Sequence, residues 1–362
     1  MTVRSAVVAG WYPGAMRAVA PVSQALAERG WDVRVLTTAF AMPIAAHAGL
    51  SMDKTTIVSS EGSDEPFRDY WAGPVPSLLV MGIGEATLTE RRLLIDARAR
   101  RVPSIGILDT WGDYQRRIVE PAMAGAWCDV LSVMNDVVRE ELAPGYPGRV
   151  VAAGQPGLEE FMAIGLDADA RRRSKVKLGL PPRGDVVTFF SQPIAEQFGQ
   201  SLGYTQYDAL RGFLAALDGN VTAVVVPHPR EDALTLRETI AERGIVVDGG
   251  NRAELYAASD VVVSCFSASL IEAVLARRPA VSVQPGMAGP DRCWTNTLGV
   301  SEGVFASSQV AAAIGKALRL ARDGDELNRR RDAIGVRPGA VARILRLVES
   351  LEDTSVMEPM RG

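Results

Sequence analysis

The stretch Ala223-Val-Val-Val-Pro-His-Pro-Arg-Glu-Asp232 joins a short apolar run to an abrupt polar turn. The run is too short for a helix and rich in β-branched residues, so it predicts a strand buried on both faces. Proline on either side of His228 restricts the backbone where the strand ends. In open parallel sheets, ligands bind at the carboxyl ends of the strands. The stretch therefore predicts a parallel sheet with His228, one of only two histidines, at its binding edge.

Apolar runs of this kind alternate with helical patterns along the chain. In the first half, strands are expected at residues 5–10, 31–37, 55–59, 77–82, 104–109, 130–134 and 149–153. In the second half, strands are expected at residues 186–190, 222–226, 245–248, 261–265 and 280–283. After residue 307 only helical patterns remain. Repeated strand–helix–strand units predict a parallel, doubly wound sheet in each half, which is an α/β architecture.

The amino-acid composition changes between residues 154 and 184. Residues 166–177 are highly charged, and residues 179–184 (Gly-Leu-Pro-Pro-Arg-Gly) have the composition of a loop. We therefore expect two domains of ordinary size joined by a linker. The predicted organisation is a Rossmann-like domain at 1–155, a linker at 156–184, a second Rossmann-like domain at 185–335 and a C-terminal helix and tail at 336–362.

Composition excludes several classes of protein. Of 362 residues, 47% are hydrophobic and 23% are charged, as is typical of soluble globular proteins. The formal net charge of −4 argues against nucleic-acid binding, which usually needs a basic domain. The three cysteines lack metal-type spacing, and their odd number fits a reducing compartment. No apolar run approaches about 18 residues, and no signal-peptide pattern opens the chain, so we expect a cytoplasmic protein.

Two Rossmann-like domains followed by C-terminal helices resemble the GT-B fold, which many glycosyltransferases share with the UDP-N-acetylglucosamine 2-epimerase family. Pro227-His228-Pro229 is similar to the His-Pro motif of bacterial sialyltransferases and of capsule and surface-polysaccharide transferases. In the sialyltransferases this histidine stabilises the leaving phosphate of a CMP-sugar, and the epimerases carry a His-Pro after the equivalent strand. The resemblance implies two domains that face each other across a cleft. It also implies that the first binds an acceptor and the second a nucleotide sugar.

A second polar turn follows the strand expected at residues 261–265. Ser264 ends this strand, and a helix begins near Ser267, so hydroxyls and N–H groups gather at a helix N-terminus, where phosphate binds well. In the resembling enzymes, hydroxyls here hold the donor phosphate and a carboxylate such as Glu272 holds the ribose. Ser267-Ala268-Ser269 replaces the Ser-Gly-Gly of the epimerases. Ser267 could instead be a simple N-cap, and His228 a packed residue. The predicted donor-phosphate and nucleotide site comprises His228, Arg230, Ser264, Ser267, Ser269, Glu272 and Gln192.

The first domain is expected to supply the catalytic base. Candidates are acidic residues at strand ends, where loops face the ligand. Asp109 ends the strand at 104–109 and is the preferred base, and Glu85, after the strand at 77–82, is the second choice. Acidic residues occupy both corresponding positions in the resembling epimerases. Either residue could instead cap the helix that follows it. On the acceptor side we place Gly14, in the glycine-containing turn 10–14, and Asp113.

Two Asp-x-Asp triplets raise the question of a metal site. Asp167-Ala-Asp169 begins a helix, and Asp323-Gly-Asp325 lies in a loop between helices, so neither follows a strand. The resembling enzymes typically work without a bound metal. We therefore predict no metal and no cofactor, with the nucleotide sugar as a substrate. The arginine run 171–173 is interpreted as a solvated helix face. Weak peripheral contact with anionic lipid at the inner face of a membrane stays an alternative.

These features lead to a functional hypothesis. The chain is expected to be an inverting, metal-independent glycosyltransferase that moves a sugar from a CMP- or UDP-linked donor to a glycan or lipid-linked acceptor, in bacterial surface-polysaccharide synthesis. The first alternative is a UDP-N-acetylhexosamine 2-epimerase or a nucleotide-sugar hydrolase, which the first-domain carboxylates fit equally well. The second alternative is a non-catalytic protein that binds a nucleotide or glycan.

Overall fold

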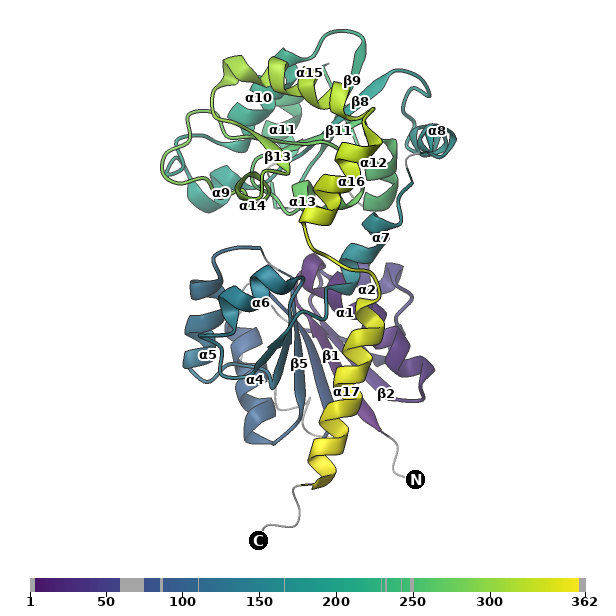
Figure 1. Ribbon diagram of the computed structural model, residues 1–362, viewed down its shortest axis with the longest axis vertical. Helices are drawn as coiled ribbons and strands as arrows, with labels where there is room; N and C mark the ends of the chain where they lie inside the picture. Colours follow the sequence, from purple (N-terminus) through teal and green to yellow (C-terminus); the bar gives the residue numbers. More distant parts are fainter. Residues whose placement is uncertain are drawn as a thin grey trace. The chain divides into compact units, whose positions relative to one another are not determined.

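The structure is a computed structural model that describes residues 4–58, 75–84, 87–109, 111–165, 167–228, 230–231, 233–241, 243–247 and 251–357. The chain divides into two compact units. Unit 1 comprises residues 1–159 and 335–362, and unit 2 comprises residues 160–334. Each unit contains one parallel sheet with helices packed around it (Figure 1). Most of the segment predicted as a linker, residues 160–184, belongs to unit 2.

The sheet of unit 1 has seven strands in the order β3-β2-β1-β4-β5-β6-β7, and all of its strand pairs are parallel. Its strands are β1 (Ser5–Gly10), β2 (Asp32–Thr37), β3 (Thr55–Ile57), β4 (Leu78–Ile83), β5 (Ser104–Leu108), β6 (Val130–Ser132) and β7 (Arg149–Val151). The helices are α1 (Pro13–Glu28), α2 (Met42–His47), α4 (Leu88–Ala99), α5 (Glu120–Met123), α6 (Asp136–Leu142) and α17 (Ala340–Met357). Short turns of helix occur at Met52–Lys54, Gln115–Val119 and Pro156–Leu158.

The sheet of unit 2 has six strands in the order β10-β9-β8-β11-β12-β13, also parallel throughout. Its strands are β8 (Asp185–Phe190), β9 (Val221–Val226), β10 (Ile245–Val246), β11 (Val261–Ser264), β12 (Ala280–Val283) and β13 (Ser301–Val304). The helices are α7 (Glu159–Met162), α8 (Ala168–Lys177), α9 (Ile194–Phe198), α10 (Gln206–Ala216), α11 (Ala233–Ile240), α12 (Arg252–Ala258), α13 (Ser269–Leu275), α14 (Trp294–Thr297), α15 (Val310–Leu320) and α16 (Gly324–Ala333), with a short 3-10 turn at Ser307–Gln309. The predicted α/β class with parallel sheets is confirmed.

Glycines let α1 approach the sheet of unit 1 closely. A methyl group on Gly82, within β4, would lie 2.5 Å from the carbonyl oxygen of Ala15. One on Gly10, at the end of β1, would lie 2.7 Å from the Cα of Met16. Because the first turn of α1 therefore lies directly on β1 and β4, its N-terminus is positioned at the carboxyl edge of these two strands.

The C-terminal helix α17 packs on unit 1, beside α1 (Figure 1). Ile344, Leu345 and Val348 are buried in the same hydrophobic core as β1 and α1. Gly154 has a φ of 98°, and a methyl group there would lie 2.9 Å from the Cβ of Ala340. The sequence pattern predicts this helix but not the unit against which it packs, because its partners in β1 and α1 lie more than 300 positions earlier in the chain.

Strand β13 was not predicted. Its sequence, Ser-Glu-Gly-Val, is mostly polar, and only Val304 is buried. β13 lies at the edge of the sheet and pairs with β12 alone. An edge strand has one open side, so it needs less of the apolar run by which the central strands are recognised.

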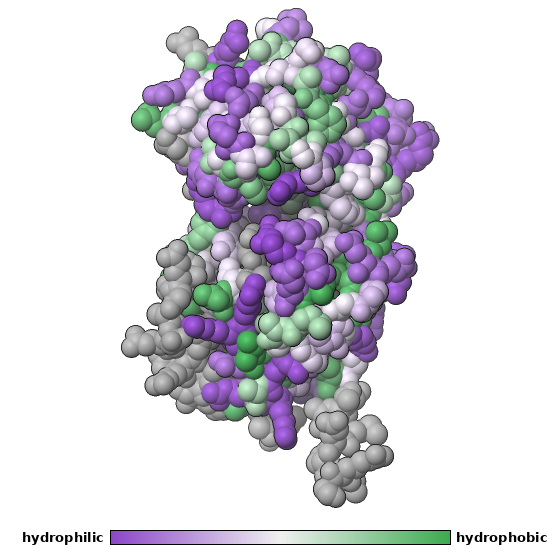
Figure 2. Space-filling view, turned by 90° about the vertical axis from the view of Figure 1, so that its left-hand side faces the viewer, coloured by the Kyte–Doolittle hydropathy of each residue, from purple (hydrophilic) through white to green (hydrophobic). Residues whose placement is uncertain are grey.

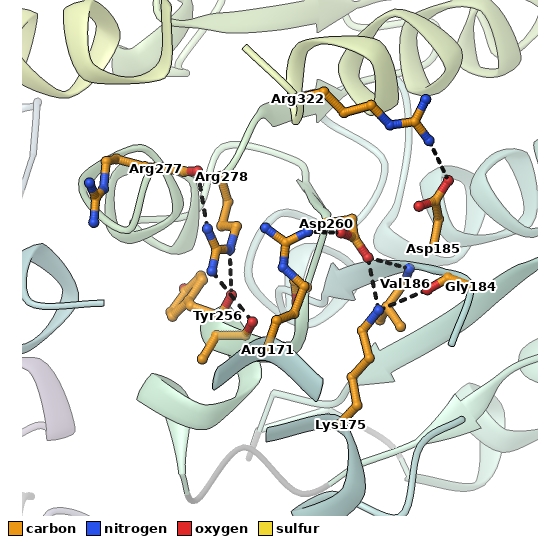
Figure 3. Close-up of polar contacts among 12 residues, drawn as sticks. Arg171, Lys175, Gly184, Asp185, Val186, Tyr256, Asp260, Arg277, Arg278 and Arg322 are labelled. Atoms are coloured by element: carbon orange, nitrogen blue, oxygen red, sulfur yellow. Dashed lines mark hydrogen bonds and ion pairs between the residues drawn. The ribbon is translucent and has the colours of Figure 1, made fainter. Parts of the chain in front are cut away.

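The charged helix α8 is anchored by a buried carboxylate. Asp260, just before β11, accepts hydrogen bonds from Arg171, from Lys175 Nζ at 3.2 Å and from the Val186 N–H at 2.9 Å (Figure 3). The side chains of Asp260 and Lys175 are 7% and 5% exposed. The prediction that residues 171–173 form a solvated helix face is therefore wrong for Arg171. An unpaired carboxylate at residue 260 would be costly to bury, so Arg171 and Lys175 turn inward.

Arg278 is a second buried cation near this cluster (Figure 3). Its guanidinium donates to the carbonyl oxygens of Tyr256 at 2.8 Å and Gly165 at 3.2 Å. Burial, together with the charge of Arg171, lowers the pKa of Arg278 to about 9. Tyr256 lies in the last turn of α12, where carbonyl groups lack helical partners, so Arg278 caps this helix and ties it to the loop before α8.

The face of the molecule drawn in Figure 2 is mainly polar. On this face, hydrophilic residues dominate and hydrophobic residues form small separate groups. None of the helices in the described part of the chain has both the length and the apolar composition needed to cross a membrane.

Candidate functional site

The carboxyl edge of the unit 2 sheet contains a topological switch point. From β8, the chain builds β9 and β10 on one side of the sheet and β11, β12 and β13 on the other. The loops that follow β8 and β11 therefore diverge, which opens the crevice where open α/β sheets bind ligands. Gln192 bridges these loops, because its Oε1 accepts a hydrogen bond of 2.7 Å from the N–H of Phe266. Gln192 thus fixes the shape of the switch point.

Ser264 has a structural role. Its side chain is fully buried, and its hydroxyl donates a hydrogen bond of 2.6 Å to the carbonyl oxygen of Phe190. The bond links the ends of β11 and β8. The prediction of Ser264 as a nucleotide-binding residue is corrected here, because its hydroxyl is turned into the sheet and has no exposed surface.

His228 follows β9 at the same edge, and its ring is held in one tautomer. Nδ1 accepts a hydrogen bond of 3.1 Å from the N–H of Arg230, so in the neutral ring the proton is on Nε2. The backbone N–H of His228 donates to Glu231 Oε2 at 2.6 Å. Burial, and then the positive charges of Arg230 and Arg252, lower the pKa of His228 to about 4. At neutral pH the ring therefore offers a neutral N–H donor rather than a positive charge.

The ionisation of His228 can be tested directly because the chain has two histidines. We expect an NMR titration of the imidazole nitrogens to show one ring that stays in the Nε2–H form from pH 8 to about pH 5 and gains a proton near pH 4. In the unfolded chain this ring gains its proton near pH 6.5. The folded protein is thus expected to lose stability as the pH falls from about 6.5 to 4. A His47→Gln variant assigns the signal, and a ring that titrates near 6.5 in the folded protein would contradict the proposed environment.

The serine turn is placed differently from the sequence-based expectation. Helix α13 begins at Ser269 and has seven residues, whereas the predicted helix begins near Ser267. Ser267 is partly exposed, and its Oγ accepts a hydrogen bond of 3.2 Å from the N–H of Ser269. Ser269 is 1% exposed, and its hydroxyl finds no partner among the described residues. Of the two hydroxyls, only that of Ser267 reaches the surface, so Ser267 both stabilises the turn and offers a donor.

Glu272 forms a buried ion pair with Arg252. Its Oε2 accepts hydrogen bonds from Arg252 Nε at 2.8 Å and from the hydroxyl of Tyr256 at 2.7 Å. Burial works against the charge of Arg252, but the attraction of Glu272 outweighs it and raises the pKa of Arg252 above its ordinary value. The implied role of Glu272 as a ribose-binding carboxylate is not supported by this geometry, since Oε2 already serves Arg252 and Tyr256.

Asp109 directly follows β5, and its backbone N–H donates a hydrogen bond of 2.9 Å to the carbonyl oxygen of Ile83 at the end of β4. Its carboxylate packs against two glycines. A methyl group on Gly14, in the first turn of α1, would lie 2.9 Å from Oδ2, and one on Gly84, just after β4, would lie 1.7 Å from Oδ1. The predicted base and the predicted acceptor-side glycine are therefore adjacent, with the carboxylate at the N-terminus of α1. Glu85 lies outside the described residues.

Asp113 is a surface residue with a local partner. It has a φ of 55° and pairs with Arg116 at 2.7 Å, and its side chain is 50% exposed. Asp113 also lies 3.9 Å from Arg117 Nε, and Arg117 Nη1 donates to the carbonyl oxygen of Gly84 at 3.2 Å. Through Arg117, Asp113 is therefore connected to the glycine that packs against Asp109.

The sequence reasoning missed three polar residues of the unit 2 edge: Arg252, Glu231 and Ser191. Glu231 binds the hydroxyl of Ser191 and the backbone of His228, and burial raises the pKa of Glu231. Ser191 directly follows β8, so its position at a strand end was an available signal. Arg252 begins a helix six positions after the end of β10, and no local pattern marks it as a site residue. In the described part of the chain, no cluster of three or more His, Cys, Asp or Glu side chains has the arrangement of a metal site.

Comparison with known proteins identifies similar structures. No protein-family model and no curated protein sequence matches the chain. The structure of S. aureus MnaA with UDP aligns with a TM-score of 0.69 at 13% identity, over 97% of this chain and 97% of that one. A UDP-GlcNAc 2-epimerase from Methanocaldococcus jannaschii, in complex with UDP-GlcNAc and UDP, aligns with a TM-score of 0.67 at 10% identity, over 96% and 100%.

A glycosyltransferase structure also aligns along the whole chain. The spinosyn rhamnosyltransferase SpnG, complexed with thymidine diphosphate, gives a TM-score of 0.58 at 16% identity, over 97% of this chain and 100% of that one. At these identities the likeness concerns the fold rather than the site. The chain therefore has the GT-B fold class predicted from its sequence, with two Rossmann-like units.

Proposed function

We propose that the chain is a glycosyltransferase that binds a nucleotide sugar at the carboxyl edge of the unit 2 sheet and transfers the sugar to a glycan or lipid-linked acceptor. One observation carries this proposal: at the end of β9, His228 is held with Nε2–H as its available ring donor, on the same edge as the partly exposed hydroxyl of Ser267. Neutral donors at a switch point suit the phosphate of a nucleotide. The nucleotide ligands of three aligned structures support the same class of ligand.

The proposed chemistry needs hydrogen-bond donors for the leaving phosphate and an acceptor for the proton. His228 and Ser267 donate hydrogen bonds to the phosphate oxygens, and so stabilise the charge that grows as the bond between the sugar carbon and the phosphate oxygen breaks. Asp109 accepts the proton of the acceptor hydroxyl as its oxygen bonds to the same sugar carbon. The nucleotide leaves with the electron pair of the broken bond. Attack opposite the leaving phosphate inverts the sugar centre and needs no metal.

A second candidate is a UDP-N-acetylhexosamine 2-epimerase or hydrolase. The aligned structures include UDP-GlcNAc 2-epimerases as well as a rhamnosyltransferase, so the fold is compatible with either class. Incubation with UDP-N-acetylglucosamine and no acceptor separates the candidates. An epimer or rapid release of free sugar supports the second candidate, whereas turnover that requires an acceptor supports the first. Nucleotide binding without any product, whether or not an acceptor is present, would favour a non-catalytic binding protein.

Nucleotide binding is the first test of the proposal. Calorimetric titration with UDP, CMP and GDP is expected to show binding of at least one of them, and His228→Ala is expected to weaken it about tenfold, the effect of losing one hydrogen bond to a charged group. His47→Ala is the matched control, since this exposed histidine lies in α2 of unit 1. Equal affinity in the two variants would remove His228 from the site, and no binding of any nucleotide would refute the proposal.

A further inference from the structure

Arg252 places a positive charge at the candidate site that the proposed chemistry does not use. Its guanidinium lies over the ring of Phe190, the last residue of β8, with a distance of 5.0 Å to the ring centroid. It also lies 5.6 Å from the centroid of Tyr256. Three hydrogen bonds fix its orientation: Nε donates to Glu272 Oε2 at 2.8 Å, Nη2 donates to the Tyr256 hydroxyl at 2.9 Å, and Nη2 also donates to Glu272 Oε2. Arg252 is thus held rigidly at the edge that carries His228.

The described residues leave one edge of this guanidinium unused. Nη1 makes no hydrogen bond to any of them, and the Arg252 side chain is 22% exposed. Phe190, whose ring the guanidinium covers, pairs with Val226, which ends β9 two positions before His228. The carbonyl oxygen of Phe190 also accepts a hydrogen bond from Ser264, three positions before Ser267. A rigid donor therefore remains at the edge that carries His228 and Ser267.

Two sets of donors fit two phosphate groups better than one. His228 and Ser267 together supply a pair of neutral hydrogen bonds, which is suited to the oxygens of a single phosphate. Arg252 adds a permanent charge and the N–H groups of Nη1, which suit the oxygens of a second phosphate. Because Glu272 and the aromatic rings already hold Arg252 in place, little side-chain freedom is lost when a ligand binds.

We propose that Arg252, positioned by Glu272, is the residue that makes the site prefer a nucleoside diphosphate over a nucleoside monophosphate. This inference rests on the proposed nucleotide site, and it decides between the UDP- and CMP-linked donors that the sequence leaves open. It also gives Glu272 a role as a positioning residue in place of the ribose-binding role implied by resemblance. The second phosphate binds Nη1, while the Nε edge stays paired with Glu272.

The test compares UDP with UMP by calorimetry. Removing Arg252 alone would leave Glu272 buried without its partner, which is strongly destabilising, so the variant is Arg252→Gln with Glu272→Gln. We expect the wild type to bind UDP more tightly than UMP. The double variant is expected to lose about 10- to 100-fold in UDP affinity, the effect of one charge-assisted hydrogen bond, and to keep its UMP affinity within about twofold. Glu272→Gln alone keeps the charge of Arg252 and should keep a preference for UDP.

Each other outcome has a distinct meaning. A double variant that keeps the wild-type ratio of UDP to UMP affinity would overturn the inference and leave Arg252 as a structural partner of Glu272. A wild type that binds UMP or CMP as tightly as UDP would also overturn it. If the double variant does not fold, Arg252→Lys is tested instead. This variant keeps the positive charge but loses the planar guanidinium, and it must lower the preference for UDP over UMP. A wild type that binds none of the nucleotides refutes the proposed function itself, before any variant is compared.

Discussion

Replacing Asp260 by asparagine is expected to lower the free energy of unfolding of unit 2 by about 3–5 kcal/mol. The side chains of Asp260 and Lys175 are almost completely buried. Without the carboxylate, Lys175 would keep its hydrogen bond of 2.8 Å to the carbonyl oxygen of Gly184 but would lose its counter-charge. A buried cation without its counter-charge is costly because the interior solvates it poorly. The change is measured by denaturant unfolding followed through a probe in unit 2, since the two units can unfold separately.

Asp185→Asn is the matched control for this prediction. Asp185 pairs with Arg322 at 3.7 Å on the surface of the same unit, and their side chains are 39% and 75% exposed (Figure 3). Exposed ion pairs contribute little, so this change should cost less than about 1 kcal/mol. If the two variants unfold at the same denaturant concentration, Asp260 is not the anchor of α8 that its contacts indicate.

The fold could be predicted from the sequence because its signals are local. The central strands β1, β4, β8 and β11 are buried apolar runs, and each run is visible without knowledge of its neighbours. Polar residues that directly follow such runs, such as His228 and Asp109, were placed at the correct edge by the same logic. The exception is β13, whose polar composition follows from its edge position.

The partners of the site residues could not be predicted, because they are distant in sequence. Arg171 and Asp260 lie 89 positions apart, and Gln192 lies 74 positions from Phe266. Arg252 and Glu272 are 20 positions apart and come from two different helices. A charged residue in a polar segment looks the same whether it faces solvent or a buried carboxylate, so Arg171 was assigned to a solvated face. Only the packing of α8 against α12 distinguishes the two.

Gly84→Ala is expected to reduce turnover almost as much as Asp109→Asn does, although it changes no ionisable group. A methyl group on Gly84 would lie 1.7 Å from Asp109 Oδ1, so the carboxylate must move from its place beside Gly14 and α1. If Asp109 is the general base, its removal should cost about 10²- to 10⁴-fold in turnover, and a displaced carboxylate should lose most of the same factor. Nucleotide release from a nucleotide sugar with acceptor measures both variants.

Two further variants separate this positional effect from loss of stability. Asp136→Asn removes another carboxylate of unit 1, one that is exposed and paired with Arg139 at 3.0 Å, and it should leave turnover unchanged. Gly219→Ala adds a methyl group with no neighbour within 4 Å, and it should change neither turnover nor thermal unfolding. Overpacking at Gly84 should cost about 1–3 kcal/mol of stability, which leaves a folded protein to assay.

If folded Gly84→Ala turns over at the wild-type rate while Asp109→Asn is inactive, the base does not need the position that the two glycines create. If both are fully active, the carboxylate at the N-terminus of α1 has a structural role, and the proton acceptor must lie elsewhere.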